Sequence, residues 1–230
     1  MLNYTVPSEV LRPYLPPFTE LDTWEGQAMI SVVGFLFNKT RVIGIAWPFH
    51  TNFEEVNLRL YIKHFDGKTW KRGVAFVSEI VPKQLIAQIA NSWYNEHYSA
   101  LPMRHTLEKD RENINVRFEW KTRSGERWNS LSARAGALPQ DIRNGSQEEF
   151  IFEHYYGYNK LRENKTIEYS IAHPRWQVYP VNSFELDCDT LELYGPDFFP
   201  YITSKPLSVY LARGSAVSVK LPRKITGGSA

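Results

Sequence analysis

The sequence is short of the residues that build covalent and metal centres. Cys188 is the only cysteine among 230 residues, so no disulfide can form within the chain. Its neighbours Asp187 and Asp189 predict a raised thiol pKa, the opposite of what a nucleophile needs. There is no cysteine pair, no His-x-x-x-His and no Asp-rich calcium loop. Glycine-rich phosphate loops, dinucleotide fingerprints and Gly-x-Ser-x-Gly are also absent. We therefore expect no metal and no cofactor.

An excess of one charge and long apolar runs are lacking too. The chain has 27 basic and 25 acidic residues, a net charge of +2, which gives no reason to expect a nucleic-acid or membrane partner. No stretch approaches the roughly 18 consecutive apolar residues of a membrane span. Residues 1–17 have no basic region followed by an apolar run, as a secretory signal would. These absences predict a soluble, cytoplasmic protein.

Aromatic residues, in contrast, are abundant. They make up 14% of the chain, with seven Trp and thirteen Tyr, which favours β structure or the wall of a cavity over a helical bundle. No internal repeat or low-complexity linker divides the sequence, and single β domains of this length are common. We predict one domain over residues 1–224, followed by a flexible tail at 225–230.

Strand patterns outnumber helical ones, so the predicted fold class is mainly β (α+β) with a few helices. Asp66-Gly67 marks a turn between two strands and predicts a hairpin. Ser146 suits a helix N-cap, with Glu148 and Glu149 in the first turn. The predicted strands are 21–38, 54–65, 70–80, 113–121, 128–135, 165–173, 177–186 and 207–221. The predicted helices are 8–15, 82–93 and 146–156.

The most informative pattern lies in the strand at 55–63. Its apolar residues Val56, Leu58, Leu60 and Ile62 point to one face, because side chains alternate along a strand. The other face forms a polar stripe of Glu55, Asn57, Arg59, Tyr61 and Lys63. A solvent face of an antiparallel sheet explains this stripe, and so does the lining of a barrel or cleft. The preceding segment 47–53 is predicted to be an ordered loop and supports a cavity, so both explanations stay open.

Two other segments combine reactive side chains. His97 and Tyr98 follow the predicted helix closely enough for general acid–base work with Glu96, although a capped helix end explains them equally. His173 and Trp176 flank Pro174-Arg175, which suggests either a ligand wall or a packed corner. Lys63 and the Lys71–Arg72 pair are possible Schiff-base sites, but ordinary exposed lysines are the favoured interpretation.

Several segments together resemble a known family. Residues 10–16, 21–26 and 53–62 (the last reading Phe-Glu-Glu-Val-Asn-Leu-Arg-Leu-Tyr-Ile), with 153–158 and 173–176, resemble the YqjF-like family of uncharacterised bacterial proteins over nearly the whole chain. That family is similar in fold to acetoacetate decarboxylase. The resemblance implies an antiparallel β-barrel or cone with flanking helices and a central cavity. It also implies that the polar stripe faces this cavity and that Glu55 matches an active-site glutamate.

One departure from the decarboxylase pattern stands out. Those enzymes carry Phe/Tyr-Pro-Lys-Lys after the helix, where one lysine forms the Schiff base. Residues 95–98 of this chain, Asn-Glu-His-Tyr, contain no lysine. The resemblance therefore does not extend to Schiff-base decarboxylation, unless Lys63 or Lys71 has taken over from another strand.

Three functional hypotheses remain. The first is a cavity site for a small oxo- or hydroxy-acid, with lyase- or hydratase-like chemistry; its catalytic residues are Glu55, His97 and Tyr98, and its ligand-binding residues are Arg59, Asn57, Tyr61, Arg72, His173 and Trp176. It predicts that Glu55 and His97 lie close together. The second is a non-catalytic ligand-binding or sensor module. The third is a structural protein or homo-oligomer in which an Arg59–Glu55 pair braces the barrel. The sequence does not specify the ligand.

Overall fold

The computed structural model describes residues 1–38, 52–95 and 97–226. Its strands are β1 (Leu2–Thr5), β2 (Glu20–Leu21), β3 (Thr23–Trp24), β4 (Gln27–Phe37), β5 (Phe53–Phe65), β6 (Trp70–Val81), β7 (Tyr98–Ala100), β8 (Met103–Lys109), β9 (Asn113–Lys121), β10 (Trp128–Gly136), β11 (Gln140–Asp141), β12 (Tyr156–Arg162), β13 (Lys165–Ala172), β14 (Gln177–Tyr179), β15 (Val181–Asp187), β16 (Ser208–Val209), β17 (Leu211–Ala212), β18 (Ser218–Val219) and β19 (Arg223–Thr226). The helices are α1 (Ser8–Leu11), a 3₁₀ turn at Arg12–Tyr14, α2 (Gln84–Tyr94), α3 (Gln147–Phe152), α4 (Thr190–Tyr194) and α5 (Phe199–Ile202).

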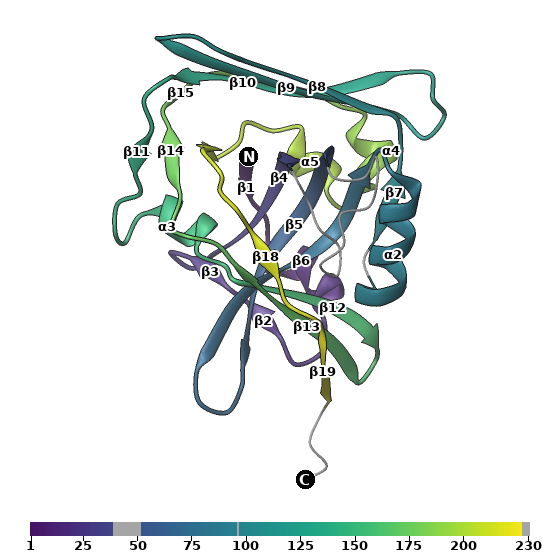
Figure 1. The fold of residues 1–230 in the computed structure, drawn as a ribbon. Coiled ribbons are helices and arrows are strands. Elements are labelled where there is room, and N and C mark those ends of the chain that lie inside the picture. The colour runs from purple at the N-terminus through teal and green to yellow at the C-terminus, as the bar shows by residue number, and fades with distance from the viewer. Residues whose placement is uncertain (39–51, 96, 227–230) are drawn as a thin grey trace.

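These strands form three sheets (Figure 1). The largest follows the order β16-β1-β4-β5-β6-β12-β13-β18, with β2, β3, β7 and β19 attached to it. A second sheet, β15-β10-β9-β8, lies across one end of the first, and β11, β14 and β17 form the third. The predicted mainly β fold with few helices is confirmed. In the described part of the chain the largest sheet is open, with no pairing between β16 and β18.

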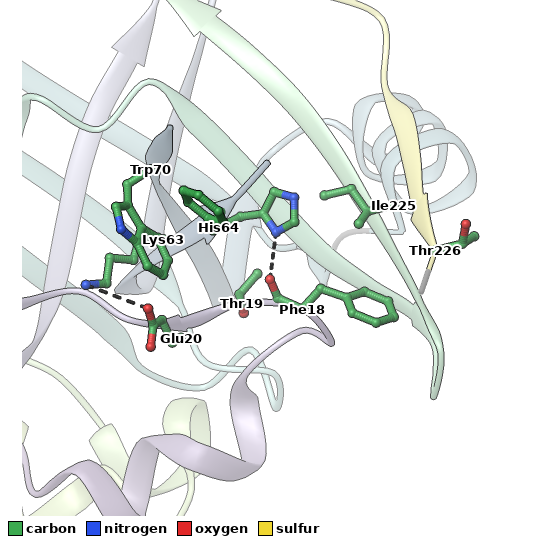
Figure 2. Close-up of a pocket in the computed structure, with 9 residues that line it drawn as sticks. Phe18, Thr19, Glu20, Lys63, His64, Trp70, Ile225 and Thr226 are labelled. Carbon is green, nitrogen blue, oxygen red and sulfur yellow. Dashed lines mark hydrogen bonds and ion pairs between the residues drawn. The ribbon is translucent and has the colours of Figure 1, made fainter. Parts of the chain in front are cut away.

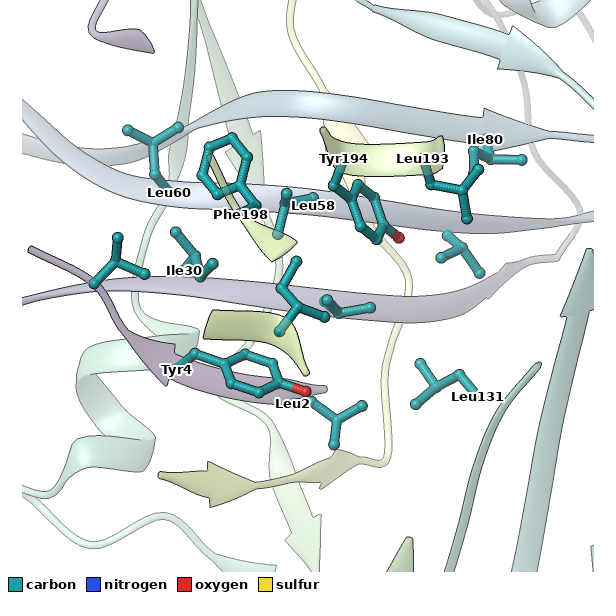
Figure 3. Close-up of a cluster of buried hydrophobic side chains, with 14 of the residues drawn as sticks. Leu2, Tyr4, Ile30, Leu58, Leu60, Ile80, Leu131, Leu193, Tyr194 and Phe198 are labelled. Atoms are coloured by element: carbon teal, nitrogen blue, oxygen red, sulfur yellow. The ribbon is translucent and has the colours of Figure 1, made fainter. Parts of the chain in front are cut away.

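Strand β5 lies at the centre of the large sheet and packs its apolar face into the main core. Val56, Leu58 and Leu60 are fully buried there. They meet Leu193 and Tyr194 of α4, together with Leu2, Ile30, Phe198 and Leu131 from other elements (Figure 3). Phe118 and Trp120 of the second sheet complete this core. The alternation in the sequence therefore predicted the core face of β5 correctly.

The polar face of β5 is covered as well. Helix α3 contributes Phe150 to the apolar cluster around Tyr61, at one end of the stripe. Helix α2 contributes Ile86 to a smaller cluster around Phe53, at the other end. Glu55 is only 1% exposed. The interpretation of the stripe as a solvent face was therefore wrong for Glu55, Asn57 and Tyr61, which are all buried, whereas Lys63 at the turn end stays partly exposed.

The helix predicted at 146–156 is shorter than expected. Ser146 does cap it, since its Oγ accepts a hydrogen bond from the backbone N–H of Glu149 at 3.3 Å. The helix ends at Phe152, and Tyr156 already begins β12, which pairs with β6 in parallel and with β13 antiparallel. Pairing with two neighbouring strands makes the extended conformation of this aromatic segment more stable than a continued helix.

The C-terminal part also differs from its prediction. Residues 207–221 form three short strands rather than one, and Gly214 with φ of 72° interrupts them. Ile225 and Thr226, which we assigned to the tail, pair with β13. Residues 227–230 and the predicted loop at 47–51 lie outside the described residues.

Two glycines allow strands and rings to approach closely. Gly34 in β4 lies under Phe118, where an added Cβ would stand 2.8 Å from a ring carbon. Gly157 in β12 lies under its cross-strand partner Tyr169, where an added Cβ would stand 2.1 Å from Cζ. Neither glycine has a positive φ, so the backbone conformation does not require glycine there. The requirement comes from the lack of space for a side chain.

Candidate active site

Glu55 belongs to a buried polar cluster at the α2 end of the stripe. Its Oε1 accepts a hydrogen bond from Asn57 Nδ2 at 2.9 Å, and its Oε2 accepts one from the Tyr98 hydroxyl at 2.7 Å. Glu79 is 1% exposed and lies opposite Asn57 in the β5–β6 register. Asn57 Oδ1 is buried and has no hydrogen-bond partner among the described residues. The cluster combines carboxylates with a phenolic donor, the groups that general acid–base chemistry uses.

The local chain conformation places Tyr98 in this cluster. Asn95 adopts the left-handed conformation at φ of 52° and ends α2. The side chain of Asn91 then accepts a hydrogen bond from the backbone N–H of Tyr98 at 2.9 Å and donates one to its carbonyl at 3.0 Å. Strand β7 pairs with β6 so that Tyr98 lies beside Glu79. The backbone of Tyr98 is thus fixed by Asn91 and by pairing with β6, and this directs its side chain toward Glu55.

Arg59 lies at the middle of the stripe and is half-buried. Its Nη2 makes two long hydrogen bonds, to the Tyr61 hydroxyl at 3.5 Å and to the Ile151 carbonyl at 3.4 Å. Its Nε is buried without a partner, and no described carboxylate forms an ion pair with it. The bracing Arg59–Glu55 pair is therefore not seen. A guanidinium in this state has unused donors suited to a carboxylate.

A chain of hydrogen bonds fixes Tyr61 beside Arg59. The hydroxyl groups of Tyr61 and Ser31 lie 2.5 Å apart, and Ser31 in turn donates to Asn3 Oδ1 at 2.6 Å. All three residues are buried. Because their partners come from three adjacent strands, Tyr61 has little freedom to turn away from Arg59.

A second polar cluster joins buried Asp22 and His154 to the partly exposed Arg72. Asp22 Oδ2 accepts a hydrogen bond from Arg72 Nε at 2.6 Å and lies 3.1 Å from His154 Nε2. Burial alone raises the pKa of Asp22, but the bonds from His154 and Arg72 outweigh it and the net pKa is lowered. Burial lowers the pKa of His154 from its ordinary 6.5 to about 4, despite the bond to Asp22. The imidazole is therefore neutral at pH 7, with Nε2–H donating to Asp22.

His154 is the residue that sequence reasoning missed. It contacts the ring of Tyr61, with centroids 4.9 Å apart, and its charge state is affected by Arg59. Its Nδ1 is buried without a described partner. His154 lay within the helix predicted at 146–156, and nothing in its spacing pointed to Asp22, 132 residues earlier.

The nine predicted site residues fall into separate groups. Glu55, Asn57 and Tyr98 lie together, Arg59 is joined to Tyr61, and Arg72 is joined to Asp22. His97 is exposed. It contacts the cluster through its backbone, where its carbonyl accepts a hydrogen bond from the Glu79 N–H at 3.2 Å.

His173 and Trp176 stack on each other, and Trp176 packs against the apolar cluster that includes Tyr61. Their rings stack with centroids 4.2 Å apart, and Trp176 Nε1 donates to Ser215 Oγ. This arrangement matches the packed corner that the sequence allowed. Trp176 reaches the α3 side of the molecule through Phe152, 5.8 Å away between centroids.

The two lysines considered as nucleophiles lie far from Glu55. Lys63 is eight residues further along β5, about 26 Å at the rise of an extended strand. Lys71 pairs with His64 in the β5–β6 register and forms ion pairs with Asp66 and Glu168. Both belong to the turn end of the hairpin, whereas Glu55 lies at its open end.

Cys188 is a half-buried free thiol. The pKa of this thiol is raised to about 12, which is the direction that the sequence predicted. The main cause is burial and not the flanking carboxylates.

Within the described residues, no group of three or more His, Cys, Asp or Glu could hold a metal ion. None of the described helices is long and apolar enough to cross a membrane.

Tyr98→Phe should weaken the fold by a measurable amount. The change removes the 2.7 Å donor to a buried carboxylate, and hydrogen bonds to charged groups contribute about 1.5–3 kcal/mol. We expect a lower urea midpoint with an unchanged m value. Tyr201→Phe is a matched control, because Tyr201 lies on the short surface helix α5 with a half-exposed side chain. Equal midpoints for the two variants would contradict the bond.

The model of the DUF2071 family, described as an uncharacterized conserved protein, matches residues 1–216. The chain belongs to the DUF2071 family. It is similar to the uncharacterized protein YqjF of Bacillus subtilis, at 27% identity over 175 residues, which cover 76% of this chain and 69% of the relative.

Solved structures show which fold this DUF2071 protein adopts. The enduracididine biosynthesis enzyme MppR matches with a TM-score of 0.62 and 14% identity, covering 99% of this chain and 85% of MppR. Acetoacetate decarboxylase from Legionella pneumophila gives 0.61 and 11%, covering 98% and 82%. An acetoacetate decarboxylase-like enzyme from Sphingomonas wittichii gives 0.56 and 13%, covering 98% and 87%. The fold is acetoacetate decarboxylase-like, as the sequence resemblance implied.

Proposed function

We propose that this protein binds a small oxo- or hydroxy-carboxylic acid along the polar face of β5. The observation that carries the proposal is Arg59, a half-buried guanidinium without a described carboxylate partner. Leaving such a charge without a counter-ion is costly, and a bound carboxylate supplies one in bidentate geometry. The name of one structural relative, MppR complexed with pyruvate, supports this class of ligand.

The chemistry we propose is proton transfer by Glu55. With the acid held at Arg59, the carboxylate of Glu55 takes a proton from the carbon next to the ligand carbonyl. The Tyr98 hydroxyl turns from Glu55 to donate a hydrogen bond to the enolate oxygen, and protonated Glu55 then returns a proton to the carbon. Such a step suits a lyase or hydratase and needs no cofactor. We assign no Schiff base, because Lys63 and Lys71 are held at the other end of the hairpin.

Ligand binding is tested by thermal shift with pyruvate, lactate and acetoacetate at 10 mM. A ligand well above its dissociation constant stabilises by mass action, by about 2.7 kcal/mol at a hundredfold excess. We expect at least one acid to raise the melting temperature of the wild type and of Arg117→Met, which removes a half-exposed arginine on the second sheet. Arg59→Met should abolish the shift. A shift that Arg59→Met retains contradicts the proposal.

Proton exchange separates an enzyme from a binding module. In D2O, the wild type should speed the exchange of the methyl protons of pyruvate, measured by proton NMR, and Glu55→Gln should reduce this rate by about 100-fold or more. A sensor or carrier with the same site would give the thermal shift without exchange. We favour the enzyme because Glu55, with its donor Tyr98, lies on the same face of β5 as Arg59.

A further inference from the structure

A hollow lies at the turn end of β5, beside the β5–β6 turn (Figure 2). Its volume is about 450 Å³, within the range of small-molecule sites. It is lined by Phe18, Thr19, Glu20, Lys63, His64, Phe65, Trp70, Ile225 and Thr226. Because Lys63 is about 26 Å along the strand from Glu55, this turn pocket is distinct from the site proposed above.

Three exposed aromatic rings surround the turn pocket. Phe65 and Trp70 face each other across the hairpin with ring centroids 5.2 Å apart, and they are 49% and 51% exposed. Phe18, from the segment before β2, is 42% exposed. Ile225 of β19 adds an aliphatic side chain. Apolar groups that converge from separate segments on one hollow, with polar groups at the rim, are typical of a binding site.

Phe18 is held in a strained conformation. Its φ of 66° lies in the left-handed region that side chains rarely adopt. Three hydrogen bonds keep it there: His64 Nδ1 donates to the Phe18 carbonyl at 2.7 Å, Thr19 Oγ1 to Pro16, and Thr166 Oγ1 to Pro17. Strain of this kind persists where the surroundings enforce it and is concentrated at ligand sites.

Two polar groups of the pocket have unused hydrogen-bonding capacity. The Lys63 ammonium lies 3.8 Å from Glu20 and 4.5 Å from the centre of the Trp70 ring, and it makes no hydrogen bond within the described residues. His64 uses only Nδ1 there, which leaves Nε2 available. The long ion pair to Glu20 is weak, because both side chains are partly solvated.

We propose that the turn pocket binds a small aromatic carboxylate. Its ring packs among Phe18, Phe65 and Trp70, and its carboxylate accepts hydrogen bonds from the Lys63 ammonium. An organic cation is also attracted by aromatic rings, but Lys63 already lies over Trp70 and repels a second positive charge. The proposal is independent of the function proposed for the β5 stripe.

Three matched probes test the charge of the ligand: 2-naphthoate, 2-naphthylmethanol and 2-naphthylmethylammonium. Calorimetry and saturation-transfer NMR on the full chain should show that naphthoate binds most tightly. Lys63→Met keeps the apolar stem and should weaken naphthoate about tenfold, while Lys68→Met, on the same turn but outside the pocket, should have no effect. Glu20→Gln should strengthen naphthoate binding several-fold, because it removes the competing carboxylate.

The opposite signs of these variants make the outcome decisive. If the ammonium probe binds as tightly as naphthoate, if Lys63→Met and Lys68→Met behave alike, or if no probe binds, the proposal is overturned. Phe18→Gly tests the strained residue without unfolding, since glycine suits the left-handed backbone. We expect its melting temperature to stay within a few degrees while naphthoate affinity falls about fivefold or more. Arg59→Met should leave naphthoate binding unchanged, which separates the two sites.

Discussion

Gly157→Ala is expected to lower the free energy of unfolding by about 3 kcal/mol or more, as severe overpacking does. The new methyl group would lie 2.1 Å from Cζ and 2.4 Å from the hydroxyl oxygen of Tyr169. Tyr169 is 7% exposed, so its ring cannot move outward without opening a buried layer. β12 is also hydrogen-bonded on both sides, to β6 and β13, which prevents the backbone from yielding. Urea denaturation followed by circular dichroism measures the change.

Gly136→Ala is the matched control for this substitution. It adds the same methyl group in a strand, but the nearest atom is the flexible ring of Pro180 at 3.2 Å. We expect a change of less than about 1 kcal/mol. Shrinking the ring in the double variant Gly157→Ala/Tyr169→Leu should recover part of the loss, so that the two changes are not additive. Equal stability of Gly157→Ala and Gly136→Ala would show that the ring does not fill this space.

Acid should destabilise the protein between pH 6.5 and 4 through His154. Its pKa is about 4 in the folded chain against 6.5 for the ordinary group. The unfolded state therefore binds a proton first as pH falls, and stability that is present above pH 6.5 is lost as pH approaches 4. A separation of this size corresponds to about 3 kcal/mol. Urea midpoints measured at half-unit steps of pH should show the slope.

His154→Gln should flatten this slope, because glutamine has no proton to gain. Above pH 7 the curves of wild type and variant should run parallel, which provides an internal control for any general loss of stability. The imidazole resonances of His154 should titrate near pH 4 by NMR. A slope that persists in His154→Gln would assign the acid sensitivity to another group.

The polar stripe illustrates what local sequence could predict. Alternation alone placed Val56, Leu58 and Leu60 in the core, since a strand has only two faces. It could not decide whether Glu55 meets water, because that depends on α2 and α3, which lie 29 and 92 or more residues further along the chain. Whether distant helices pack on one face of a strand cannot be read from the sequence of that strand. The family resemblance, and not periodicity, supplied the preference for a buried stripe.

Side-chain partners were harder still to foresee. Tyr98 was singled out for its neighbours His97 and Glu96, yet it reaches Glu55 because Asn91 orients its backbone. The candidate pair Glu55–His97 gave way to Glu55–Tyr98, since Tyr98 in β7 donates to Glu55 whereas His97, just before that strand, is exposed. The turn pocket was missed altogether, since Phe18 and Ile225 are more than 200 residues apart and meet only through the hairpin.

The position of β1 has a consequence for how the chain is made. One edge of β1 pairs with β4, which is synthesised soon after β1. Its other edge pairs with β16, and Asn3 bonds to Ser208, 205 residues later. Until β16 is synthesised, β1 presents a row of free N–H and C=O groups to any strand it meets, the usual template for edge-to-edge aggregation. The last part of the chain thus protects the first, and a nascent chain stalled before Ser208 should be the form that most needs a chaperone.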